Sequence, residues 1–101
     1  MISVKDISIS NYEVDGKSGV TLAFDKMNSV NKGDFVYISV FDEEIELNSI
    51  SDSSVELWLD WIVSNFNIKS STSTAIRKDK SIEILNNGSE EHKLEIDTGS
   101  E

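Results

Sequence analysis

Residues 53–67 form the one long stretch of this chain in which apolar residues recur with the period of an α-helix. The stretch reads SSVELWLDWIVSNFN, and Ser53 and Glu56 match the Ser-x-x-Glu capping box that marks the start of many helices. Before and after it, apolar and polar residues alternate with the period of two that is typical of strands. This order predicts an α+β fold: one domain over residues 1–101, with a mostly antiparallel sheet of about six or seven strands and the helix, about residues 53–67, packed on one face.

The segment FVYISVF at residues 35–41 has apolar residues on both of its alternating faces. Such a pattern is typical of a strand that is covered on both sides, so we expect residues 35–41 to lie in the centre of a sheet. In an unbroken strand Phe41 would share one face with Phe35 and Tyr37.

The polar segments predict where the strands end or change direction. The first strand changes phase near residues 5–6 and 10–11, which predicts bulges or bends there. The run SSTST at residues 70–74 predicts a mobile loop, and residues 98–101 predict a frayed tail. Turns are expected at three places rich in Gly, Asn, Asp and Lys, namely residues 15–19, 78–80 and 86–88.

A helical wheel of residues 53–67 has a broad apolar arc and a separate apolar ridge. Six residues fill the arc and are expected in the core: Val55, Trp58, Leu59, Ile62, Val63 and Phe66. Leu57 and Trp61 lie four residues apart and form the ridge. Two readings of this ridge stay open. Either the C-terminal hairpin or the 70–74 segment covers it, or Trp61 anchors a partner, because tryptophan is enriched among interface hot spots.

The acidic residues concentrate in the middle of the chain. The net charge is −10, yet residues 1–32 carry four acids and four bases, which cancel. Residues 33–68 carry eight acids and no base, whereas residues 69–101 carry seven acids and five bases. If the 42–46 hairpin and the polar side of the helix face the same way, they form one negative patch. Such a patch attracts a basic partner in a salt-dependent way and repels nucleic acid.

Several classes of function lack support in the sequence. The chain has no cysteine, and it contains no nucleophile elbow, phosphate-binding loop or dinucleotide fingerprint. The single histidine, His92, is expected at the edge of a strand, and the acidic 42–46 segment lacks the spacing of an EF-hand loop. We therefore expect no catalysis, no cofactor and no resident metal site. No stretch matches a signal peptide or a membrane span, so a cytoplasmic location is expected.

These features together favour a binding protein that neutralises a basic protein partner. Small size, acidic charge and an aromatic surface suit an immunity protein, which is an antitoxin-type inhibitor of a bacterial toxin such as a nuclease, and which acts by occluding its cationic cleft. The residues expected to contact the partner are Asp42, Glu43, Glu44, Glu46, Glu56, Leu57, Asp60 and Trp61.

Two alternatives remain, one within binding proteins and one from a different class. A phage-type mimic of nucleic acid would display its carboxylates along two edges in the manner of a duplex. A structural or assembly subunit would self-associate through the ridge formed by Leu57 and Trp61.

Overall fold

The architecture is taken from a computed structural model that describes residues 6–27, 29–30, 33–41, 43–47, 53–87 and 94–99. Within these residues the fold is α+β, and every paired strand is antiparallel, as the sequence predicts. The elements in chain order are β1 (Ser8–Val14), β2 (Lys17–Ala23), β3 (Ser29–Val30), β4 (Phe35–Val40), β5 (Glu43–Leu47), β6 (Ser53–Ser54), α1 (Val55–Lys69), β7 (Ser73–Lys78), β8 (Ser81–Asn86) and β9 (Leu94–Gly99).

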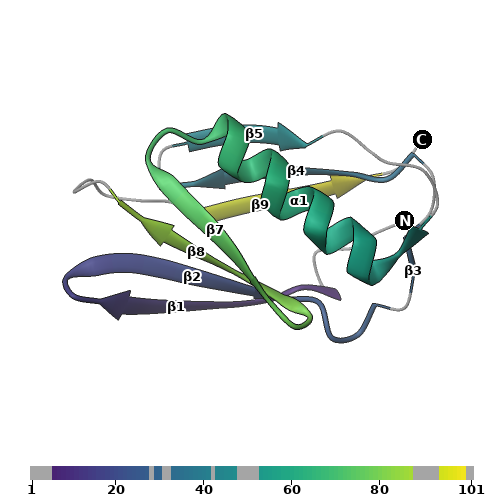
Figure 1. Ribbon diagram of the computed structural model, residues 1–101, viewed down its shortest axis with the longest axis horizontal. Helices are drawn as coiled ribbons and strands as arrows, with labels where there is room; N and C mark the ends of the chain where they lie inside the picture. Colours follow the sequence, from purple (N-terminus) through teal and green to yellow (C-terminus); the bar gives the residue numbers. More distant parts are fainter. Residues whose placement is uncertain are drawn as a thin grey trace.

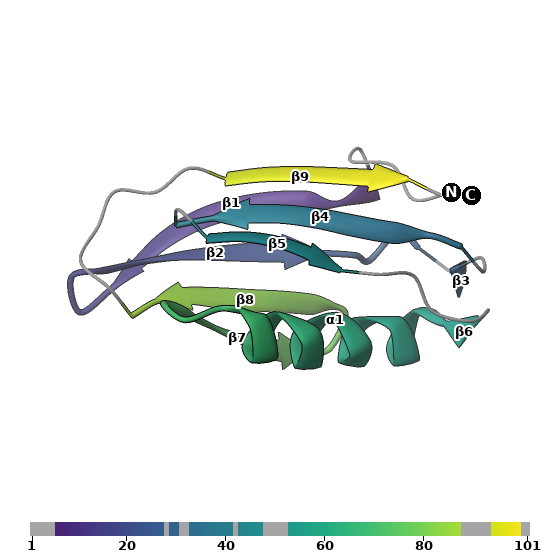
Figure 2. The ribbon, with the colours of Figure 1, turned by 90° about the horizontal axis from the view of Figure 1, so that it is seen from above.

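The strands form a four-stranded sheet in the order β1-β2-β8-β7, a three-stranded sheet in the order β5-β4-β9 and the short β3-β6 pair. Helix α1 runs between β5 and β7, which are edge strands of the two larger sheets, and it contacts both (Figure 1). Seen from above, α1 and β7 lie on one side of the molecule and β9 lies on the other (Figure 2). The helix therefore fills the space that the two sheets leave open at these edges.

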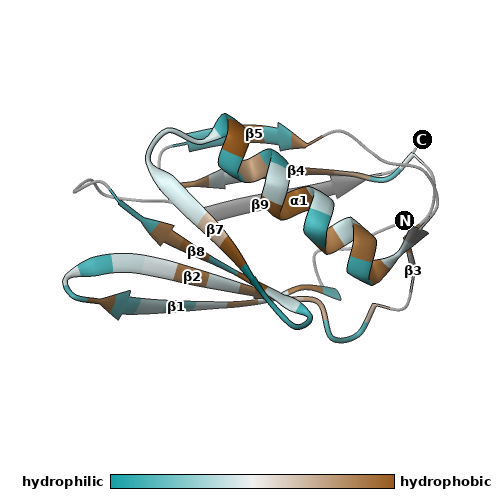
Figure 3. Ribbon diagram, viewed as in Figure 1, coloured by the Kyte–Doolittle hydropathy of each residue, from teal (hydrophilic) through white to brown (hydrophobic). Residues whose placement is uncertain are grey.

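The core receives side chains from both larger sheets and from α1. Trp58 is fully buried and makes an edge-to-face contact with Phe24, with the ring centroids 5.9 Å apart. Brown, hydrophobic bands on α1 alternate with teal ones in Figure 3, as expected for a helix with one buried face. The buried residues of α1 are Val55, Trp58, Leu59, Ile62 and Phe66, which are five of the six residues predicted for the core arc; Val63 is partly buried against the same core.

The prediction of a central strand at residues 35–41 is correct for β4 and wrong for Phe41. Strand β4 lies between β5 and β9, and its residues Val36, Ile38 and Val40 are buried. Phe41 leaves the strand with a φ of 54° and joins the core cluster, so it does not extend the face of β4. A bulky residue rarely adopts this left-handed conformation, and burial of the ring offsets part of its cost.

Strand β1 contains no bulge at residues 10–11, where the sequence predicted a bulge or a bend. Its pairing with β2 runs without interruption from Ser8↔Ala23 to Val14↔Lys17. Because most side chains of this strand are exposed, neither face requires strict alternation of apolar and polar residues. The predicted change at residues 5–6 involves Lys5, which lies outside the described residues.

The N-cap of the helix lies one residue later than predicted. Ser54, in place of the predicted Ser53, is the N-cap, and its hydroxyl accepts a hydrogen bond from the Leu57 amide at 3.4 Å. At the other end the helix reaches Lys69, and Ser73 already belongs to β7. The loop predicted at residues 70–74 is therefore shorter than expected, because only residues 70–72 connect α1 to β7.

The predicted turns at residues 15–19 and 78–80 are present as tight connections between β1 and β2 and between β7 and β8. Asp15 and Gly16 both have positive φ, as a type I′ hairpin turn requires. The predicted frayed tail begins too early, because Thr98 and Gly99 still pair with β4. Of the third predicted turn, Asn86 is the last residue of β8 and Asn87 follows it, while Gly88 lies outside the described residues. Residues 89–93 with His92, and residues 100–101, also lie outside them.

Candidate partner-binding surface

Two exposed apolar residues of α1 align with a partly buried one. Leu57 is 61% exposed and Ile68 is 80% exposed, whereas Trp61 is partly buried against the core. At 100° per residue these three positions fall within about 40° of one another on the helix. We call Leu57, Trp61 and Ile68 the α1 stripe. Neither the 70–74 segment nor a C-terminal strand covers Leu57, so the reading in which the ridge is fully buried is wrong for this residue.

The carboxylates of Glu56 and Asp60 are paired with a base that lies far along the chain. Arg77 of β7 extends to the helix, where its Nη2 lies 2.6 Å from Glu56 Oε1 and its Nη1 lies 2.6 Å from Asp60 Oδ1. Nη1 also donates to the backbone oxygen of Glu56 at 3.0 Å. The hydrogen bond to Asp60, and then the one to Glu56, raise the pKa of Arg77, because both favour the charged guanidinium. One side of α1 is thus much less negative than its sequence implies.

Glu43 serves a structural role at the start of β5. Its Oε1 accepts hydrogen bonds from Ser71 Oγ at 2.7 Å and from Thr72 Oγ1 at 2.9 Å. The bond from Ser71 is the main reason that the pKa of Glu43 is lowered, and the bond from Thr72 adds to it against an opposing effect of burial. These bonds join β5 to the connection between α1 and β7. Glu43 is therefore already occupied within the fold.

Along β5, Glu44 and Glu46 are exposed, whereas Ile45 and Leu47 are buried. Lys69 near the end of α1 donates to the backbone oxygen of Glu46 at 2.7 Å. Because α1 contacts β5 and Lys69 lies in its last turn, the C-terminal end of α1, where Ile68 lies, runs beside this acidic strand. Asp42 lies outside the described residues.

The predicted binding residues are therefore divided between the two sides of α1. Glu56 and Asp60 face β7 through Arg77, whereas Glu43, Glu44 and Glu46 belong to β5 on the other side. The expectation of one continuous negative patch is wrong. Sequence reasoning also missed Ile68, although the seven-residue spacing from Trp61 was a signal that could have identified it.

Helix α1 also satisfies backbone groups of the strand β7 beside it. The Asn67 amide donates from Nδ2 to the oxygen of Ala75 at 2.8 Å, and its Oδ1 accepts from the nitrogen of Ala75 at 2.7 Å. This pair of bonds imitates the contact that a neighbouring strand would make. Together with Lys69 on β5, Asn67 protects the outer edges of both strands beside the helix.

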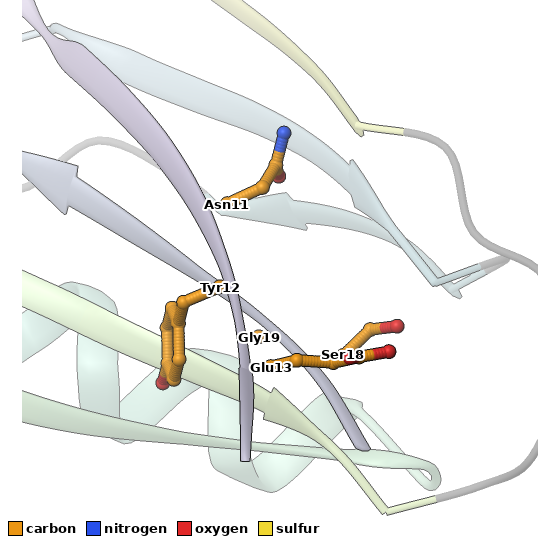
Figure 4. Close-up of a pocket in the computed structure, with 5 residues that line it drawn as sticks. All are labelled: Asn11, Tyr12, Glu13, Ser18 and Gly19. Atoms are coloured by element: carbon orange, nitrogen blue, oxygen red, sulfur yellow. The ribbon is translucent and has the colours of Figure 1, made fainter. Parts of the chain in front are cut away.

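A second surface feature lies on the β1–β2 hairpin. Asn11, Tyr12, Glu13, Ser18 and Gly19 line a hollow of about 330 Å³ (Figure 4). The Tyr12 ring lies against its cross-strand partner Gly19, where any added side chain would collide with it. Burial, and then the charge of Glu83, raise the pKa of Tyr12, because both oppose formation of the phenolate. The hollow has one carboxylate in its lining and is not lined by a cluster of catalytic groups.

No family model, curated protein or solved structure matches this chain. In the part of the chain that the structure describes, no group of three or more His, Cys, Asp or Glu residues could hold a metal ion. The same residues contain no helix that is both long enough and apolar enough to cross a membrane. The α1 stripe and the acidic strand β5 are therefore the basis for inferring a function.

Proposed function

We propose that this protein is a non-catalytic binding protein that neutralises a basic protein partner, in the manner of an immunity protein that inhibits a bacterial toxin. The observation that carries the proposal is the α1 stripe. Leu57 and Ile68 are more than half exposed and align with Trp61 on one helix, next to the acidic strand β5. An aligned apolar surface with a charged border is the usual composition of a protein interface.

The two parts of this surface have different roles in the proposal. On binding, the α1 stripe buries apolar surface against the partner. Its exposed residues contribute most to the free energy of binding, because they lose the most contact with water. Glu44 and Glu46, together with the chain's net charge of −10, attract a basic partner and accelerate its association. Inhibition follows if the bound protein occludes a cationic cleft, such as the substrate cleft of a nuclease.

The structure changes which residues should matter most. Glu43 is held by Ser71 and Thr72, and Glu56 and Asp60 are held by Arg77, so their contribution to binding is smaller than that of Glu44 and Glu46. This division also weighs against a nucleic-acid mimic, which needs two displayed rows of free carboxylates. The proposed contact set is Glu44, Glu46, Leu57, Trp61 and Ile68.

The test begins with affinity capture from the native cell extract at low and high salt, followed by purification of the captured protein and measurement of its Kd. We expect a basic protein whose binding weakens with salt. The double variant Glu44→Gln/Glu46→Gln should slow association, and Ile68→Ser should weaken binding by about tenfold or more. Ser64→Ala is the matched control, because Ser64 is an exposed, polar residue of the same helix.

Three results would contradict the proposal. Absence of a salt-sensitive partner would remove its main support. Equal Kd values for the wild type, Ile68→Ser and Ser64→Ala would exclude the α1 stripe as the contact. A captured nucleic-acid-binding protein that DNA displaces, with binding independent of Ile68, would favour the mimic instead.

A further inference from the structure

Strands β1 and β9 are the edge strands of the two larger sheets that lie away from α1, and β1 is the one whose side-chain exposure the structure describes. Strand β1 pairs with β2 on one side, and no described strand pairs with it on the other (Figure 1). Its sequence SISNYEV spans seven residues without a proline, a lysine or a bulge, which are the features that usually protect an edge. Ile9 is 39% exposed and Val14 is 44% exposed. The edges of β5 and β7, by contrast, face α1.

The turn geometry fixes which backbone groups of β1 face outward. In a hairpin with a two-residue turn, the residues that flank the turn form a hydrogen-bonded pair, and such pairs then alternate along the strands. Val14 and Lys17 flank the turn at Asp15 and Gly16. The N–H and C=O groups of the alternate residues of β1, which are Ile9, Asn11 and Glu13, therefore point away from β2.

We propose that a second copy of this chain binds along β1 by antiparallel strand pairing centred on Asn11. In this arrangement Asn11 lies opposite Asn11 of the second copy, and Ile9 lies opposite Glu13. All three outward-facing residues of each strand then meet as hydrogen-bonded pairs. The pairing joins the two four-stranded sheets into one sheet around a two-fold axis, which is the commonest symmetry of homo-oligomers.

The distribution of charge favours a second copy at this edge. The described segment that contains β1 and β2, residues 6–27, carries four acids and two bases, so it accounts for only −2 of the chain's net charge of −10. Glu13, the one charged residue of β1, lies opposite Ile9 in the proposed register, so no like charges oppose each other. A basic partner gains little from this weakly charged edge, whereas a second copy avoids the stronger repulsion that it would meet at β5.

Sedimentation equilibrium over a wide range of protein concentration tests the proposal. The wild-type mass should rise from 11.3 kDa toward twice that value, and added salt should promote association because it screens the net charge. Asn11→Pro removes an outward N–H that pairing with β2 does not use, so it should leave the fold intact and keep the chain monomeric. Asn11→Ala retains the backbone group and should still associate.

A second variant keeps the test decisive if Asn11→Pro disturbs the hairpin. Asn11→Lys retains the N–H but places like charges opposite each other at the two-fold axis, and it should weaken association by about tenfold or more. Trp61→Ser should leave association unchanged, which separates this interface from the α1 stripe. A wild-type mass of 11.3 kDa at all concentrations, or association unaffected by Asn11→Lys, would overturn the proposal.

Discussion

The edges of β5 and β7 differ from the edge of β1 in what satisfies their backbone groups. Side chains of α1 bind the edges of β5 and β7. On β7, Asn67 makes both hydrogen bonds of Ala75, and on β5, Lys69 donates to the backbone oxygen of Glu46. No described strand or side chain covers β1 in this way. The sequence predicts α1 as a helix packed on the core. In the structure, α1 also satisfies backbone groups at two sheet edges, as a neighbouring strand would. The edge of β1, one of the two edges that α1 does not cover, is left available for intermolecular contact.

The largest expected effect comes from weakening the packing of α1 on the core, because α1 covers the edges of β5 and β7. Trp58→Ala removes a fully buried side chain and its contact with Phe24, and it should lower the free energy of unfolding by about 3–5 kcal/mol. Urea denaturation measures this loss. Trp61→Ala is the matched comparison on the same helix and should cost clearly less, because Trp61 is only partly buried. Equal losses would show that α1 is not held through Trp58.

A smaller effect is expected from uncovering β7 alone. Asn67→Ala leaves both backbone groups of Ala75 without their partner and should cost about 1–3 kcal/mol in the free energy of unfolding. Ser64→Ala, at an exposed position of the same helix, should change it by less than about 0.5 kcal/mol. If the two variants are equally stable, water replaces the Asn67 amide without loss and the edge needs no cover.

The smallest effect concerns Glu43, which joins β5 to the start of β7. Its folded pKa is lowered, so its contribution to stability is complete above the unfolded pKa and disappears as the pH falls through the folded value. Glu43→Gln should cost about 1 kcal/mol near neutral pH and make the acid side of the stability profile shallower. Ser71→Ala should have the same effect on the profile, and the double variant should add little to it. Independent, additive effects would contradict the assigned hydrogen bond.

The sequence predicted those parts of the fold that depend on local pattern. The buried face of α1, the turn at Asp15 and Gly16 and the central position of β4 each follow from hydrophobic period or from turn chemistry within a few residues. The errors of one residue have a similar origin. Ser53 and Ser54 are both suitable caps, and only packing of the helix decides that Ser54 is used.

The candidate site was less predictable because its contacts join distant parts of the chain. Arg77 lies 17 residues from Asp60, and Ser71 lies 28 residues from Glu43, so no periodic pattern relates them. These pairings neutralise or occupy half of the acids that the sequence assigned to one patch. Local charge counts overestimate a negative surface whenever the fold brings a base from another element.

Backbone hydrogen exchange followed by NMR tests the contrast between the edges most directly. The amide of Ala75 donates to Asn67, whereas the amide of Asn11 is expected to face solvent, so in dilute protein Ala75 should exchange far more slowly than Asn11. Protection of Asn11 should then rise with protein concentration as copies pair along β1, while that of Ala75 stays constant. Equally fast exchange at Ala75 and Asn11, or strong protection of Asn11 in the dilute monomer, would contradict the account.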